Sequence, residues 1–166
     1  MRKMSSAAIL VCMVTLLSML WMPTVHASTP GKTMPVSGTW SWTATIISVR
    51  EAGDNTFIYA TEHDTFHGTF EGTGEGPFTV VVHPEGFMTG RGRTVFTPTD
   101  TVMGKSGTLV IQWVGNTKTL GRWKCMWVIL SGTGELANLR GQGIGVETEP
   151  GSFTLDLSGK IVFAPD

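Results

Sequence analysis

Apolar and polar side chains alternate clearly in the segment between residues 36 and 46. Every second position there is apolar or glycine, and every position between is serine or threonine. A period of two residues is typical of a strand with one buried face. We therefore predict a strand in this segment, followed by a turn at residues 50–55, where Arg-Glu-Ala-Gly-Asp-Asn breaks the alternation.

Further extended segments follow at short intervals. They are expected at residues 56–71, 78–82, 87–97, 108–114 and 120–130, in a short segment ending at residue 146, and at 153–163, with glycine-rich breaks such as 72–76 between them. No segment after residue 27 shows a sustained apolar repeat of 3.6 residues. Seven or eight closely spaced strands indicate an all-β sandwich or barrel. Glycines inside the strands, and the lack of any disulfide, favour a single antiparallel β-barrel of about eight strands, formed by residues 36–166.

Residues 131–145 have the pattern of a corner between two strands. Leu136 and Leu139 are spaced as on a single helical turn. The glycines before this turn are expected to bend the chain with φ > 0, and those after it, at a period of two, leave one strand face without side chains. The predicted structural corner consists of Gly132, Gly134, Glu135, Gly141 and Gly143.

This corner also carries a resemblance to a known family. Gly107-Thr-Leu-Val-Ile followed by Ser131-Gly-Thr-Gly-Glu-Leu-Ala-Asn-Leu-Arg-Gly-Gln-Gly143 resembles a family of uncharacterised bacterial proteins related to the allene oxide cyclase barrel. Similar glycine-rich corners occur in plant dirigent proteins. The resemblance covers roughly residues 56–163 and implies an eight-stranded barrel able to hold an apolar molecule. It also implies a homo-oligomer, since the plant relatives are trimers, but it carries over no catalytic residue.

The first 27 residues have the composition of a signal peptide. A basic start, Met1-Arg-Lys, precedes an apolar run at residues 7–22, and small residues occupy the last positions before a polar segment. The alternative is a membrane anchor, but the run is shorter than the ~20 residues needed to span a bilayer. We expect cleavage after Ala27, a flexible segment at residues 28–35, and a secreted or periplasmic protein with no membrane segment after cleavage.

Charge and cysteine content exclude several classes of function. The formal net charge is −1, and the basic residues are scattered singly, so nothing indicates binding to nucleic acid. Beyond the predicted signal peptide the chain has only Cys125, which excludes an intramolecular disulfide. The sequence contains no nucleophile elbow or phosphate-binding loop, and no cofactor is expected.

Aromatic residues supply the candidate ligand-binding positions. Tryptophans that share a face of the barrel either form the wall of an apolar pocket or fill the interior. A cysteine between two of them is either a pocket thiol or an inert core residue. The candidate ligand-binding set is Trp40, Trp42, Trp113, Trp123, Trp127 and Cys125.

Carboxylates and histidines supply the remaining candidates. Glu62, Glu71, Glu75 and Glu135 are candidates for acid–base chemistry, although Glu75 and Glu135 end two similar Gly-Thr-Gly-Glu segments and fit a hydrogen bond within a turn better. His63 and His67 have the spacing of helical zinc ligands. On a strand this spacing separates them by ~13 Å, so a polar surface is favoured over a metal site.

These observations favour an exported β-barrel that binds a small apolar ligand. The alternatives are a cyclase or isomerase that uses the same cavity, and a barrel that serves only for interaction or self-assembly. Simple binding predicts a roomy interior without buried charge, an enzyme predicts a carboxylate inside, and an interaction protein predicts a filled barrel with an exposed apolar patch.

Overall fold

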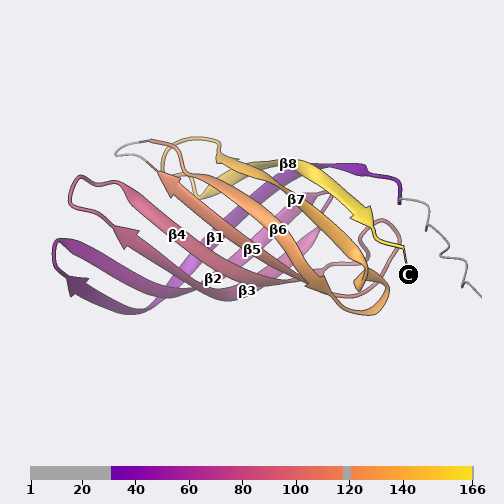
Figure 1. Ribbon diagram of the computed structural model, residues 1–166, viewed down its shortest axis with the longest axis horizontal. Helices are drawn as coiled ribbons and strands as arrows, with labels where there is room; N and C mark the ends of the chain where they lie inside the picture. Colours follow the sequence, from indigo (N-terminus) through magenta and orange to yellow (C-terminus); the bar gives the residue numbers. More distant parts are fainter. Residues whose placement is uncertain (1–30, 118–120, 166) are drawn as a thin grey trace, which may run out of the picture.

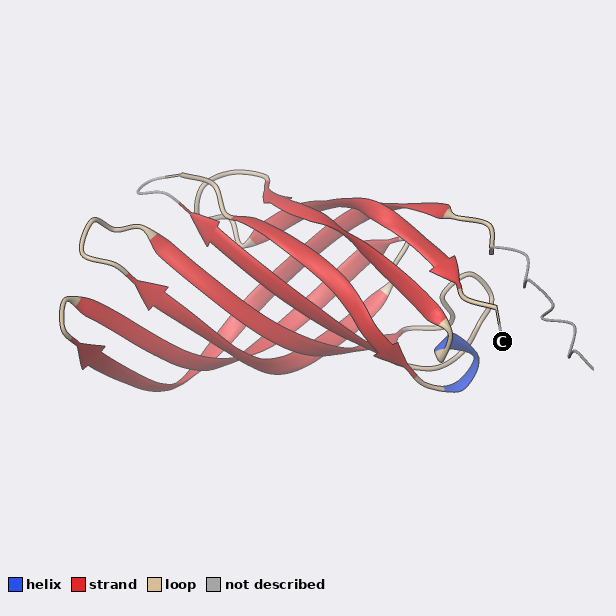
Figure 2. Ribbon diagram, in the orientation of Figure 1, coloured by secondary structure: helices blue, strands red, loops and turns tan. Residues whose placement is uncertain are grey.

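The computed structural model describes residues 31–117 and 121–165. The predicted signal peptide and its cleavage site lie outside these residues. The described chain forms eight strands and one short 3₁₀ turn, shown in Figure 2. They are β1 (Met34–Ala52), β2 (Asn55–Gly68), β3 (Gly72–Val82), β4 (Met88–Pro98), β5 (Leu109–Thr117), β6 (Lys124–Gly132), η2 (Gly134–Leu136), β7 (Leu139–Glu147) and β8 (Thr154–Phe163).

The strands form one closed antiparallel barrel. Each strand pairs with the next along the chain, and β8 pairs with β1 from Met34↔Ile161 to Ser41↔Thr154. In Figure 1 the strands cross the barrel at a slant, and two hairpins, β1–β2 and β3–β4, project at the end opposite the carboxyl terminus. This architecture confirms the predicted fold class. Within the described residues, no helix has the length and apolar character needed to cross a membrane.

Two turns differ from the sequence prediction. β1 continues to Ala52, so the first turn is only Gly53-Asp54. The predicted break at residues 72–76 is wrong, because these residues begin β3 and the chain turns at residues 69–71 instead. The physical reason is packing: a Cβ on Gly76 would collide with the Arg93 carbonyl oxygen of β4. Glycine there permits a close approach of strands rather than a turn.

The predicted corner is present, with one correction. Gly134 has φ 56° and opens the 3₁₀ turn, but Gly132 does not have a positive φ. Instead, a Cβ on Gly132 would collide with the Leu136 carbonyl oxygen, so space rather than backbone conformation requires glycine. On β7, a Cβ on Gly141 would lie 2.5 Å from Ile161 Cγ2. The glycine face of β7 therefore admits neighbouring groups as predicted.

The interior of the barrel is filled at one end. This is the end that carries the β2–β3, β4–β5 and β6–β7 connections and both described termini (Figure 1). Large side chains with less than 2 % exposure fill it, among them Phe66, Phe96, Leu109, Leu136 and Leu139. A contiguous apolar plug of this kind closes the barrel at that end.

Candidate functional site

The opposite end of the barrel contains a cavity of about 860 Å³. Its walls are largely apolar and include six aromatic side chains, from Trp40, Trp42, Phe78, Trp113, Trp123 and Phe153. Two of the lining residues are exposed: Ile46, at 61 %, and Phe153, at 53 %. The cavity therefore begins at the apolar plug and reaches the surface beside the β7–β8 turn and the part of β1 around Ile46.

Glycines on β4 and β5 make room for two of the indole rings. A Cβ on Gly92 would lie 2.6 Å from Trp113 Cε2, and a Cβ on Gly115 would lie 2.7 Å from Trp123 Nε1. Both distances are shorter than a van der Waals contact. The two rings therefore lie against the strand backbone, which leaves space along the barrel axis.

Glu62 on β2 is a carboxyl group buried in this cavity wall. Its exposure is 2 %, and Trp113 Nε1 donates to Oε1 at 2.9 Å and to Oε2 at 3.0 Å. Burial, followed by the charge of Asp64, raises the pKa of Glu62 from 4.5 to about 8, although the Trp113 hydrogen bond opposes the rise. The carboxyl group is therefore mainly protonated at neutral pH and has an O–H to donate.

Asp64 lies two residues further along the same face of β2, at the boundary with the plug. Trp40 Nε1 donates to its Oδ1 at 2.8 Å. Oδ2 and the neighbouring Thr94 Oγ1 are buried and have no hydrogen-bond partner of good geometry among the described residues. Burial raises the pKa of Asp64, while the nearby Thr94 hydroxyl and the Trp40 N–H oppose the rise. Two indole–carboxyl pairs therefore lie where the hollow and filled parts meet.

Glu147 accepts hydrogen bonds from two backbone segments at the rim of the cavity. Its side chain is 6 % exposed; Oε2 accepts the backbone N–H of Trp123 at 2.9 Å, and Oε1 accepts that of Phe153 at 3.2 Å. Phe153 has φ 54°, an uncommon conformation for a bulky residue. Its ring packs against Trp42 with a centroid distance of 4.9 Å. Glu147 thus ties the β7–β8 turn to the start of β6.

The structure brings most of the predicted ligand-binding residues together. Trp40, Trp42, Trp113, Trp123 and Cys125 all line the cavity. Trp127 does not line it, and packs against Phe70 in the filled part with a centroid distance of 5.9 Å. Burial raises the pKa of Cys125 to about 12, so its thiol remains protonated and is a poor nucleophile.

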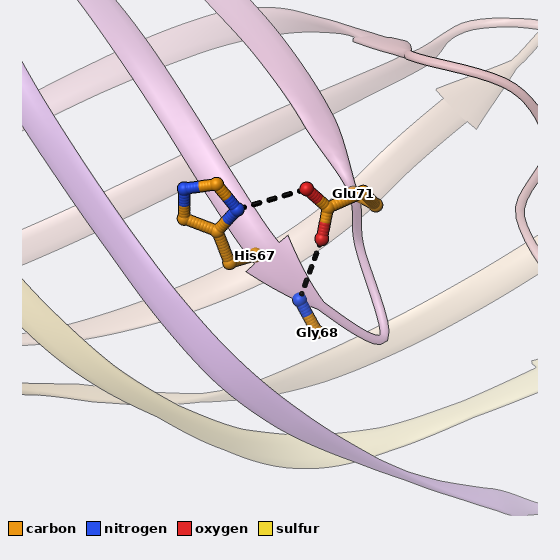
Figure 3. Close-up of polar contacts among 3 residues, drawn as sticks. All are labelled: His67, Gly68 and Glu71. Carbon is orange, nitrogen blue, oxygen red and sulfur yellow. Dashed lines mark hydrogen bonds and ion pairs between the residues drawn. The ribbon is translucent and has the colours of Figure 1, made fainter.

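The other candidate residues lie away from the cavity. His63, His67 and Glu75 are exposed on the outer faces of β2 and β3. His67 Nδ1 lies 2.8 Å from Glu71 Oε1, and Glu71 Oε2 accepts the Gly68 N–H at 3.1 Å (Figure 3). These contacts, the His67 one first, lower the pKa of Glu71. No group of three metal-ligating side chains occurs among residues 31–117 and 121–165.

The predicted turn role holds for only one of the two similar Gly-Thr-Gly-Glu segments. Glu135 Oε2 accepts the backbone N–H of Ser106 at 3.0 Å and its hydroxyl at 2.9 Å. Glu75 lies within β3 rather than in a turn, so the prediction of a turn hydrogen bond for it is wrong. The two segments share a sequence pattern but not a structure.

Sequence reasoning missed three residues of the site: Asp64, Phe78 and Glu147. A signal for Asp64 was present, because the period of two that places Phe66 inward also places Asp64, Glu62 and Ala60 inward. The pattern gave no such signal for Glu147, whose role depends on the backbone of β6 and on the β7–β8 turn. Glu62 was one of four candidate glutamates, and it is the one that lines the cavity.

The comparisons with known proteins identify the family. The model of DUF3224, described as a protein of unknown function, matches residues 38–158. The chain belongs to this family. A DUF3224 protein of unknown function from Shewanella oneidensis MR-1, solved as a crystal structure, is similar with a TM-score of 0.68 and 18 % identity, covering 81 % of this chain and 100 % of that one. At this identity the likeness concerns the fold alone. No curated protein matches the chain.

The family is described as one of unknown function, so the evidence for function lies in the cavity. The match to DUF3224 spans all of the cavity-lining residues, from Trp40 to Leu155. The relationship to the allene oxide cyclase barrel stays a prediction. In this DUF3224 protein the cavity offers a large apolar contact area, one carboxyl group able to donate or accept a proton, and an opening at the rim.

Proposed function

We propose that this DUF3224 protein binds a small, largely apolar molecule in the hollow half of its barrel. The observation that carries the proposal is the cavity of about 860 Å³ with aromatic walls and the buried Glu62 carboxyl group. Pockets for small molecules are usually ~300–1,000 Å³, mostly apolar, with few polar groups that orient the ligand. The cavity has this size and this composition.

The two kinds of lining group have different roles in the proposal. Apolar contact supplies affinity, because each Å² of apolar surface removed from water contributes roughly 25 cal/mol. Glu62 supplies orientation, because a ligand without a matching polar group leaves its O–H without a partner. The preferred ligand is therefore apolar over most of its surface and carries one polar group at the end that enters first.

A pair of substitutions on β1 tests the proposal. Ala44 lines the cavity and is paired with Glu62 across the strands, whereas Thr45 follows it and lies outside the lining set. Ala44→Trp is expected to reduce the affinity for N-phenyl-1-naphthylamine, a dye that is uncharged at neutral pH, by about tenfold or more, since it occupies the space beside Glu62. Thr45→Trp is the matched control and should leave the affinity unchanged. Dye fluorescence gives both values.

Two results would contradict the proposal. One is an absence of dye binding by the folded wild-type protein. The other is equal loss of affinity in both variants while circular dichroism shows that both are folded. Native mass spectrometry of protein purified from its host without organic solvent adds an independent measurement, because a bound molecule appears as extra mass that disappears on denaturation.

A cyclase or isomerase acting on an apolar substrate is a second candidate, favoured by Glu62 alone. A general acid or base works best when its pKa lies near the working pH, and burial brings that of Glu62 to about 8. If the protein is such an enzyme, Glu62→Gln abolishes turnover of the molecule identified by mass spectrometry and retains its binding. Turnover that survives this substitution would exclude the role for Glu62.

Export and self-association belong to the same proposal. We propose cleavage after Ala27 and a secreted or periplasmic location; mass spectrometry of the protein from the host should find Ser28 at the amino terminus, and an intact Met1 would contradict it. A homo-oligomer is supported by an exposed apolar row across β5, β6 and β7, formed by Val114, Met126 and Ile144. A purely monomeric mass under native conditions would exclude it.

A further inference from the structure

The ionisable side chains that line the cavity are all acidic within the described residues. Among the described lining residues, Glu62 and Glu147 are the only ones with an acidic side chain, and no lysine, arginine or histidine lines the cavity. Asp64 adds a third buried carboxyl group directly below Glu62 on β2. An anionic ligand, such as a fatty acid, would bring a like charge into this low-dielectric space with no cation to balance it.

The aromatic walls have the complementary property. Trp113 lies next to Glu62, and its ring makes edge contacts with Trp40 and Trp123 at centroid distances of 6.2 and 6.1 Å. Phe78 packs on the same ring at 6.1 Å. Aromatic faces attract organic cations within about 6 Å, and tryptophan does so most strongly. Rings from β1, β3 and β5, and from Trp123 just before β6, thus line the cavity together with this carboxyl group.

We infer that the ligand of this cavity is a lipophilic amine or other organic cation, held with its positive group between Glu62 and the surrounding tryptophan rings. This inference rests on the proposed function and names the ligand class for the same site. The apolar part of the ligand then lies toward the rim, against Ile58, Val80 and Phe153.

Binding of a cation is coupled to release of a proton. In the free protein, burial and the charge of Asp64 hold Glu62 mainly protonated, with its pKa at about 8. A positive group beside the carboxyl group favours the ionised form, so the carboxyl O–H bond breaks, the proton passes to solvent, and a carboxylate–ammonium pair remains. The net charge inside the cavity stays the same, which is why the exchange is possible in an apolar interior.

Other titratable groups near Glu62 do not reverse this coupling. Asp64 faces it from the same strand, and Cys125 faces it from β6. Glu147 lines the cavity at the rim, and its oxygens accept two backbone N–H groups. β1, β3, β4 and β5 contribute indole, phenyl, threonine, aliphatic and methionine side chains to the lining, with no charge. The ionisable groups that line the cavity, within the part of the chain that the structure describes, are therefore all acids, which favours a cationic ligand over an anionic one.

Three probes with the same alkyl chain test the inference. Octyltrimethylammonium carries a fixed positive charge, octanol is neutral, and octanoate is anionic at pH 7. Tryptophan fluorescence and titration calorimetry of the wild-type protein should show about tenfold tighter binding of the cation than of octanol, with octanoate the weakest. Calorimetry in two buffers of different ionisation enthalpy should also show release of up to one proton per bound cation and none for octanol.

Two substitutions and a pH series distinguish the contribution of Glu62 to cation binding from that of the rest of the cavity. Glu62→Gln keeps an acceptor for the Trp113 N–H and should remove the preference for the cation while octanol still binds. Glu75→Gln, on the outer face of β3, is the matched control and should behave as wild type. In the wild type, cation affinity should rise between pH 6 and 8 by up to about tenfold per pH unit, because only the ionised form pairs with the probe.

The outcomes distinguish this inference from the function on which it rests. If octanol binds as tightly as the cation, or if cation affinity is independent of pH in the wild type, the inference is wrong and apolar binding in the cavity stands. If none of the probes and no dye bind to the folded protein, both are wrong. The pH series on the wild type gives a decisive result even if the Glu62 variant does not fold.

Discussion

Glu62 is held in an arrangement that suits a neutral carboxyl group better than an ionised one. Among the described residues its two oxygens share a single donor, the Trp113 indole, and its exposure is 2 %. An ionised carboxyl group accepts about four hydrogen bonds in water, so most of that solvation is lost here. Asp64 nearby adds repulsion between like charges. Both effects oppose ionisation in the folded state and are absent in the unfolded chain.

The stability of the protein should therefore fall as the pH rises from 5 to 8. The folded state binds a proton at Glu62 up to a pKa of about 8, whereas the unfolded chain releases it near 4.5, so the unfolded state binds fewer protons in this range. The free energy of unfolding of the wild type relative to Glu62→Gln should decrease by up to about 1.4 kcal/mol per pH unit and level off above pH 8. Urea unfolding at pH 5, 7 and 9 measures this difference.

The comparison with Glu62→Gln separates this residue from its neighbour. Burial also raises the pKa of Asp64, so both proteins should retain a pH dependence from that group. Only the difference between them reports on Glu62. Parallel pH profiles for the two proteins would show that Glu62 titrates normally in the folded state.

At the residue scale, the sequence predicts which face a side chain occupies but not its depth in the barrel. The period of two places Trp123, Cys125 and Trp127 on one face of β6 and of the residue before it, and all three side chains do face the interior. Trp123 lines the cavity, however, while Trp127 belongs to the plug. The depth of a side chain along the barrel axis depends on how far each strand is shifted against its neighbours. The alternation of apolar and polar residues within one strand does not depend on that shift and cannot predict it.

At the scale of elements, the main feature of β7 is a row of glycines on one face, where it has no side chains. Gly141, Gly143 and Gly145 alternate along it, and they face Ile161, Trp127 and Cys125 on the neighbouring strands. The large residues of β6 and β8 therefore project over β7 and fill the volume that its own side chains would occupy. This complementarity lets large side chains such as Trp127 fit inside a small barrel.

Gly143→Ala should destabilise the barrel strongly. A Cβ at this position would collide with the Ser158 carbonyl oxygen and lie 2.6 Å from Trp127 Cζ2, so either the β7–β8 ladder or the indole must move. We expect a loss of about 2–4 kcal/mol in the free energy of unfolding, measured by urea denaturation. Gln142→Ala, at the neighbouring exposed position, is the control and should change it by less than about 0.5 kcal/mol. A neutral Gly143→Ala would show that β7 can move away from β8.

The approximate number of strands and their antiparallel closure were predictable at this scale, whereas the strand order and several boundaries were not. The alternating segments led to about eight strands in an antiparallel barrel, and the structure has eight. The error at residues 72–76 arose because glycine occurs both in turns and where two strands approach each other closely. Only the position of the neighbouring strand distinguishes them: Gly74 faces Thr94 and Asp64, which no local pattern relates to it.

At the scale of the whole molecule, the barrel has one packed end and one hollow end. The packed end is closed by buried aromatic and aliphatic side chains and by η2, which contributes Leu136. At the hollow end, β1 beyond Trp42 pairs with β2 but not with β8, since the last β1–β8 pair is Ser41↔Thr154. The projecting β1–β2 hairpin therefore has one free edge beside the cavity, with Ile46 among its exposed side chains. The packed end therefore supplies most of the buried core, and the hollow end gives a ligand access to the interior.

This separation should appear in amide hydrogen exchange. Backbone amides of β5 near Leu109 and of β4 near Phe96 lie beside the plug and are expected to exchange only on global unfolding, whereas amides of the β1–β2 hairpin near Ile46 and Ile58 exchange through local opening. N-phenyl-1-naphthylamine at saturating concentration should slow exchange in the hairpin by about tenfold, because a ligand that binds only the closed hairpin lowers the open population. The same dye added to Ala44→Trp should slow it much less. Slower exchange beside the plug alone, with no change in the hairpin, would place the dye elsewhere, because a ligand that binds only the folded barrel slows global unfolding wherever it lies, whereas protection of the hairpin requires binding to its closed form.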